Sequence, residues 1–168
     1  VFAQELQRAQ AVHYRNLELK LRPMEGVELR AAYRIRPTIG VLETTNEGGS
    51  YSFSLGDMVT GEEPALLIEL IVPPRTPSVY RLAHSVLTWS DPTSSLFTSN
   101  VRTVIPIEYS ADPARVAAVV PPPKLMRVVE ALSVYKLQRR AQEAFIGGDV
   151  EGATRKLRAA ATRLLDMG

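Results

Sequence analysis

Hydrophobic and polar residues alternate over much of the first two thirds of the chain, as expected of β-strands that bury one face. Residues 17–21 carry leucine at every second position, and residues 27–35 repeat the alternation with charged residues between. Both segments end in Arg-Pro, and proline cannot donate a ladder hydrogen bond, so each strand should end there. The predicted inward-facing residues are Leu17, Leu19, Leu21, Val27, Leu29, Ala31, Tyr33 and Ile35. The predicted outward-facing residues of the second strand are Glu28, Arg30, Arg34 and Arg36.

Further strand-like segments follow at short intervals, with a turn cluster at 46–49. They cover residues 40–45, 50–55 (with Tyr51, Phe53 and Leu55 inward), 66–72, 79–90 and 101–109. Residues 66–72 are apolar except for Glu69, so we predict a central strand buried on both faces. Pro106 takes an outward position, which indicates a sheet edge or a bulge. About seven strands predict an antiparallel β-sandwich over residues 12–120, with 40–45 and 101–109 as candidate edges.

The two ends of the chain have helical patterns. Residues 1–11 have apolar positions at helical spacing and predict a short linker or exit helix. After the prolines at 121–123, one apolar stripe is predicted from Leu125 to Phe145, and Gly147-Gly148 ends that helix. Asp149 is a suitable N-cap for a second helix, whose stripe runs from Val150 to Leu164. We therefore predict a helical hairpin over residues 121–168, similar to one tetratricopeptide-type hairpin, that docks on the sandwich and stabilises it.

Composition and charge narrow the classes of function. Residues 1–123 hold 11 basic and 13 acidic side chains, whereas residues 124–168 hold 9 basic and 5 acidic ones. The basic tail residues alternate with acids and lack interleaved aromatics, so we expect no nucleic-acid binding. No segment has the roughly 18 uncharged apolar residues of a membrane span. The chain has no cysteine, which favours a cytoplasmic location. It begins with Val, so we expect it to be a piece of a longer protein.

The segment SLGDMVTGEEP, residues 54–64, combines glycine with acidic residues just before an apolar run. A phosphate loop needs a lysine and a following helix, but this segment has no lysine and leads into a strand-like run. Calcium would need more oxygen ligands at an EF-hand-like spacing. We therefore predict a turn between two strands, with Asp57, Glu62 and Glu63 as turn residues.

Candidate catalytic groups are sparse. His13 and His84 are far apart in the sequence, and no Gly-x-Ser-x-Gly elbow surrounds the serines near Ser94, Ser95 and Ser99. Trp89 and Asp91 in LTWSDP have two interpretations: the lining of a ligand groove, or a core tryptophan followed by a turn. We predict no catalytic residue, no cofactor, and no metal bound tightly by this chain.

The ordered set of segments FAQELQRAQAV, YRIRP, SLGDMVTGEEPALLIELIVP, LTWSDP and VVEALSVYKLQRRAQEAFIGGD resembles the C-terminal region of bacterial von Willebrand factor type A domain proteins. The resemblance implies a β-sandwich and helical tail that follow a metal-binding α/β domain. That domain's metal site depends on Asp-x-Ser-x-Ser, which does not occur here. Ser94 and Ser95 do not reproduce it, so the resemblance carries over no metal ligand.

Together these observations predict a non-catalytic accessory or protein-interaction region. Its expected partner is a protein or the missing α/β domain of its own protein, and we expect the isolated chain to self-associate weakly through a sheet edge. The alternative is a sandwich that binds a small ligand or carbohydrate through Trp89 and Tyr80. A hydrolase with an unrecognised site is a third hypothesis.

Overall fold

The computed structural model describes residues 12–59, 61, 63–91 and 94–166. The predicted linker helix over residues 1–11 lies outside this part of the chain. The chain divides into two compact units, Val1–Ala117 and Ala118–Gly168.

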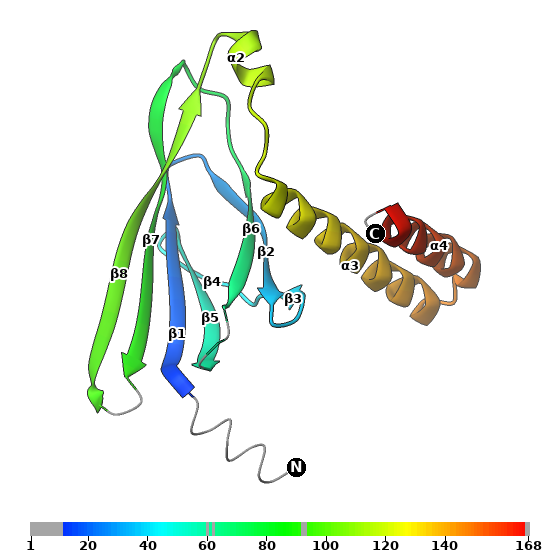
Figure 1. Ribbon diagram of the computed structural model, residues 1–168, viewed down its shortest axis with the longest axis horizontal. Helices are drawn as coiled ribbons and strands as arrows, with labels where there is room; N and C mark the ends of the chain where they lie inside the picture. The colour runs from blue at the N-terminus through cyan, green and yellow to red at the C-terminus, as the bar shows by residue number, and fades with distance from the viewer. Residues whose placement is uncertain (1–11, 60, 62, 92–93, 167–168) are drawn as a thin grey trace. The chain divides into compact units, whose positions relative to one another are not determined.

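The first unit is built from two antiparallel sheets (Figure 1). Its described elements are β1 (Val12–Pro23), β2 (Glu28–Arg36), β3 (Gly40–Val41), β4 (Thr45–Glu47), β5 (Ser50–Val59), β6 (Ala65–Ile71), β7 (Ser78–Asp91), β8 (Ser94–Tyr109) and the short helix α2 (Pro113–Ala117). One sheet has the order β4-β5-β1-β7-β8, and the other has the order β3-β2-β6. The predicted antiparallel sandwich is therefore confirmed.

The core lies between the two sheets. Leu21, Phe53 and Ala83 from the five-stranded sheet pack with Ala32 and Leu42, and each of these side chains is at most 7% exposed. The alternation in the sequence correctly predicted the inward faces of β1 and β5. Over residues 17–21 of β1 and 51–55 of β5 every second residue is apolar and lies on the face that the second sheet covers.

The predicted face of β2 is wrong for half of the strand. The β2–β6 pairing shifts register between Leu29 and Ala31, as a β-bulge does. Beyond the bulge Ala32 is buried, and Arg34 pairs with Leu66, a residue that packs against the core. Because an extra residue reverses the parity of the side chains that follow, Arg34 lies on the inner face and not on the predicted outer face. The register shifts again between Arg34 and Arg36, and Ile35 is buried as predicted.

Two other strand predictions need correction. The segment 40–45 is not one strand: β3 belongs to the three-stranded sheet and β4 to the five-stranded sheet, with the buried Leu42 between them. The turn is at Gly48-Gly49, where both residues have positive φ, as a tight hairpin requires. The strand predicted over residues 66–72 is not central, because β6 ends the three-stranded sheet and its residues 65–70 are half-buried. Its continuous apolar run resembles that of a central strand, but sequence does not show how many neighbours a strand has.

Strand β8 is a terminal strand of the five-stranded sheet, as predicted for residues 101–109, although it is longer than predicted and begins at Ser94. Its pairing with β7 shifts register next to Pro106, which pairs with Arg81. The edge and the irregularity that the proline indicated are both present, because a proline cannot donate to a continuous ladder.

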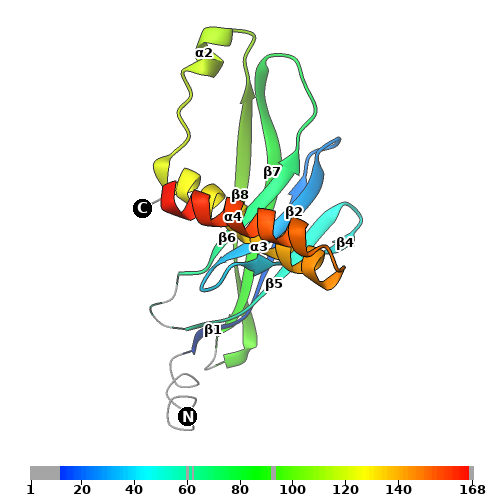
Figure 2. The ribbon, with the colours of Figure 1, turned by 90° about the vertical axis from the view of Figure 1, so that its right-hand side faces the viewer.

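The second unit is a helical hairpin of α3 (Pro123–Ile146) and α4 (Val150–Asp166), which lie side by side (Figure 1 and Figure 2). Asp149 caps α4, because its Oδ1 accepts a hydrogen bond from the backbone N–H of Gly152 at 2.8 Å. The buried Ala141 faces the hairpin partner, whereas Leu132 lies nine residues earlier, about 180° away at 100° per residue. The apolar positions of α3 therefore occupy two faces instead of the single predicted stripe.

Candidate functional site

The predicted turn in GDMVTGEEP is confirmed only for its later part: β5 extends to Val59, so Asp57 lies in that strand and not in the turn, and the connection to β6 follows Val59. Thr60 and Glu62 lie outside the described residues. Gly61 has φ 86°, a left-handed conformation that suits glycine. The turn borders the cleft between the two sheets that we take as the candidate site.

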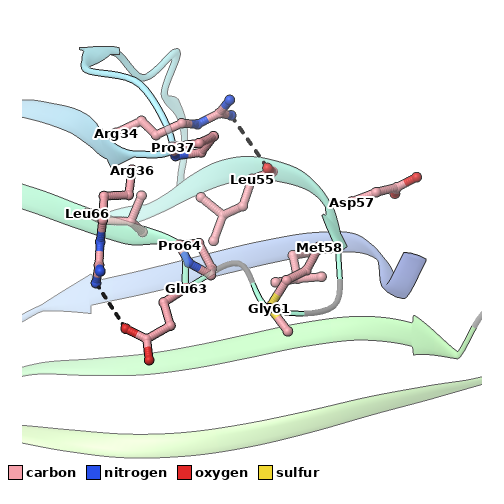
Figure 3. Close-up of a pocket in the computed structure, with 11 residues that line it drawn as sticks. Arg34, Arg36, Pro37, Leu55, Asp57, Met58, Gly61, Glu63, Pro64 and Leu66 are labelled. Atoms are coloured by element: carbon pink, nitrogen blue, oxygen red, sulfur yellow. Dashed lines mark hydrogen bonds and ion pairs between the residues drawn. The ribbon is translucent and has the colours of Figure 1, made fainter. Parts of the chain in front are cut away.

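The cleft lies between the two sheets and has a volume of about 410 Å³ (Figure 3). Its lining comes from β1, β2, β5, β6 and the adjoining turns. The residues are Leu17, Arg34, Arg36, Pro37, Leu55, Asp57, Met58, Gly61, Glu63, Pro64 and Leu66. The cleft is therefore a mixed surface, with aliphatic side chains interrupted by two arginines and two carboxylates.

Three of its four charged groups have close partners within the described part of the chain. Arg36 Nη2 lies 3.4 Å from Glu63 Oε2. Asp57 Oδ1 accepts a hydrogen bond from the backbone N–H of Asn16 at 2.9 Å, at a point where the β1–β5 register is irregular. Figure 3 shows the Asp57 carboxylate pointing away from both arginines.

Arg34 differs from the other three. Its Nη2 lies 3.5 Å from the carbonyl oxygen of Leu55, a long hydrogen bond, and no described carboxylate pairs with it. The guanidinium therefore keeps most of its five donors for water or a ligand. The period-two alternation of β2 predicted Arg34 on the solvent face. The adjacent pair Ala31-Ala32, which breaks the alternation, was the available signal for the bulge that turns Arg34 inward.

The predicted alternative site, Trp89 with Tyr80, does not assemble. The two residues are nine positions apart on β7, which at about 3.3 Å per residue separates them by roughly 30 Å. Trp89 packs edge-on against Tyr14, with ring centroids 5.5 Å apart. Tyr80 packs against Tyr109 and shares a hydrogen bond with Thr76. Both aromatics thus have structural neighbours, and they do not form one ligand surface.

The remaining candidates are also dispersed. His84 pairs in register with Arg22, nine positions from His13 along β1, so the two histidines are distant. His84 Nε2 lies 2.9 Å from Arg81 Nη1, and His13 contacts the Tyr14 ring. Ser99 pairs with Trp89, and the side chains of Ser94 and Ser95 lie outside the described part.

No group of three or more His, Asp or Glu side chains in the described ranges is placed to hold a metal ion. None of the described helices has the length and apolar character that crossing a bilayer requires.

A second candidate surface lies on β8. Val101 and Ile105 pair with Leu87 and Ala83, so they face the same side of the sheet as the core. Val101 is nevertheless 52% exposed and Ile105 36% exposed, whereas Ala83 is 1% exposed. The three-stranded sheet therefore does not cover the inner face of β8.

The hairpin has its own apolar groove, of about 380 Å³. Phe145, Val150 and Leu157 line it, and each is more than half exposed. The small Ala141 and Ala153 also line this groove, and both are buried.

Comparisons with known proteins agree with the fold. Residues 123–168 match the family described as Sll0103-like, C-terminal alpha-helical domain, which is less than half of the chain. The chain is similar to a solved structure of von Willebrand factor type A from Catenulispora acidiphila, with a TM-score of 0.77 and 13% sequence identity. The likeness covers 98% of this chain and 39% of that chain, so this chain spans well under half the length of that one. At this identity the likeness shows the fold alone. A search of the curated proteins finds no match.

Proposed function

We propose that this chain is a non-catalytic protein-interaction region of a von Willebrand factor type A-like protein. The likeness in fold and the matched helical family support this proposal. The observation that carries it is a place where a further strand fits. We call this place the strand slot: the free edge of β6 together with the inner face of β8 at Val101, Thr103 and Ile105.

The edge of β6 away from β2 has no neighbouring strand among the described residues. Within the described residues β6 pairs with β2 alone, so the N–H and C=O groups on its other edge lack a strand partner. Edge strands are usually protected by charges, prolines or bulges, because an open edge recruits other strands. β6 has seven residues, no proline and the single charge of Glu69. In its composition β6 therefore resembles an interior strand, which has a hydrogen-bonded strand on each side.

The inner face of β8 supplies apolar surface. Tyr109, the last residue of β8, donates a hydrogen bond from its hydroxyl to the carbonyl of Pro73, just after β6, at 2.8 Å. This bond ties the two terminal strands together, so a strand added beside β6 would lie over β8. Covering Val101 and Ile105 would contribute on the order of 1 kcal/mol for each half-exposed side chain.

The proposed partner is an extended segment with apolar residues at alternate positions, because only alternate side chains of an added strand face the sheet below. We propose that the α/β domain region of the same protein supplies it. The solved von Willebrand factor type A chain is longer than this one, so a protein with this fold has further segments to provide a strand.

The slot can be tested in the isolated chain, because an unfilled slot should accept the edge of a second copy. Light scattering over a hundredfold concentration range should show a mass that rises with concentration. Ile105→Lys should abolish the rise, because it places a charge in the slot. Val104→Lys is the matched control, since Val104 is 49% exposed but lies on the opposite face of β8. A constant monomer mass, or equal effects of the two lysines, would contradict the proposal.

A further inference from the structure

The cleft between the sheets has a chemistry different from that of the strand slot. We infer that Arg34 and the aliphatic wall of the cleft bind a carboxylate carried on an apolar body, such as the C-terminal leucine of a peptide. This inference does not depend on the strand slot.

The charge arrangement leaves Arg34 as the cation available to a ligand. Arg36 is matched by Glu63 at 3.4 Å, and Asp57 is held by the backbone N–H of Asn16. Among the described residues, Arg34 has only the long contact to the carbonyl of Leu55. A guanidinium drawn partly out of water is costly unless its donors are satisfied, so an anion in the cleft would lower that cost.

The geometry favours a carboxylate. A guanidinium is a planar fork whose paired N–H groups match the two oxygens of a carboxylate. The cleft also contains Asp57 and Glu63, whose negative charges would repel a doubly charged phosphate more strongly than a singly charged carboxylate. One free arginine therefore fits one monoanionic group.

The aliphatic residues beside Arg34 determine which group the ligand should carry next to its carboxylate. Arg34 pairs in register with Leu66, and its contact to Leu55 comes from the facing sheet. Leu17 and Met58 also line the cleft and complete its aliphatic surface. A ligand with a branched aliphatic group next to its carboxylate would contact both features at once, whereas acetate would contact only the arginine.

The test uses two probes that differ in charge alone. N-acetyl-L-leucine carries the carboxylate, and N-acetyl-L-leucinamide replaces it with a neutral amide. Each is titrated into the isotope-labelled chain at low salt while backbone and arginine side-chain NMR signals are recorded. We expect saturable shifts at Arg34, Leu55 and Leu66 with the acid, and binding at least about tenfold weaker with the amide, because charge-assisted hydrogen bonds are lost. Added salt should weaken the binding of the acid.

Variants separate the two arginines. Arg34→Gln should weaken binding of the acid by about tenfold or more, and Arg34→Lys should give an intermediate loss because it keeps the charge without the fork. Arg36→Gln should weaken binding less than Arg34→Gln does, because it removes no donor offered to the ligand and acts only by leaving Glu63 unpaired in the cleft. Arg102→Gln is the control and should leave binding unchanged, since Arg102 is exposed on β8 and does not line the cleft. Melting temperatures identify any variant that fails to fold, and the acid–amide comparison on the native chain does not depend on them. Equal binding of acid and amide, shifts confined to residues outside the cleft, or no saturable shift with the acid would overturn the inference.

Discussion

Two parts of the same sheet face behave differently. At β1 and β7 the inner face of the five-stranded sheet holds Leu21 and Ala83, which are 2% and 1% exposed. One strand further, at β8, the same face holds Val101 at 52% and Ile105 at 36% exposed. The residue types are alike, so the difference is in what covers them. The three-stranded sheet ends at β6, and this boundary separates apolar surface that is buried in the core from apolar surface that is exposed to solvent.

The contrast predicts a large difference in mutational cost. Phe53→Ala should lower the free energy of unfolding by about 3–5 kcal/mol, because Phe53 is fully buried and its loss leaves a cavity. Val101→Ala should change it by no more than about 0.5 kcal/mol, the usual range for surface positions. Urea unfolding of the two variants beside the native chain measures both values. A comparable loss for Val101→Ala would mean that β8 is covered in solution, and the comparison would fail.

The helical hairpin also has buried and exposed apolar residues, but here the buried residue is small and the exposed one is large. Ala160 is 3% exposed, whereas Leu165 is 83% exposed. Ala160→Leu should therefore destabilise the hairpin by about 1–3 kcal/mol, because added methylenes do not fit a close-packed contact. Leu165→Ala should have an effect within about 0.5 kcal/mol.

Circular dichroism of thermal unfolding, followed at the helical signal, can measure this pair. Gly168 and the adjoining Met167 are outside the described part, so Leu165 is the last large apolar residue for which exposure is known. If Leu165→Ala costs more than Ala160→Leu, the small alanines do not form the helix contact.

The sequence predicted the elements well and their neighbours poorly. Alternation placed Leu17, Leu21 and Phe53 correctly, because strict period-two patterning has one solution when one face is buried. The turn at Gly48-Gly49 and the Asp149 cap were also predicted, because each depends only on a few adjacent residues. These local features carry their own signals.

What sequence could not show is the arrangement that makes the two candidate surfaces. The run in β6 predicted a strand correctly but not its place at the end of a sheet, since strand order depends on residues far apart in the chain. Strict alternation predicted Arg34 on the solvent face. That prediction was wrong because the bulge after Leu29 turns the Arg34 side chain to the inner face. The prediction of a ligand site shared by Trp89 and Tyr80 was wrong, because the extended strand β7 holds these two residues far apart.

The smallest predicted effect concerns the paired arginine of the cleft. Arg36 and Glu63 have side chains that are 48% and 77% exposed, so water screens their attraction across 3.4 Å. Arg36→Gln, Glu63→Gln and the double variant form a cycle whose coupling energy should be below about 1 kcal/mol. Urea unfolding at low and high salt measures it, and salt should reduce it further. A coupling well above 1 kcal/mol would show that this end of the cleft is closed to water. The pair would then be a structural clamp, and loss of Arg36 would change the shape of the cleft beside Arg34. A small coupling leaves the exposed ion pair as screened surface charge and Arg34 as the arginine with donors to offer.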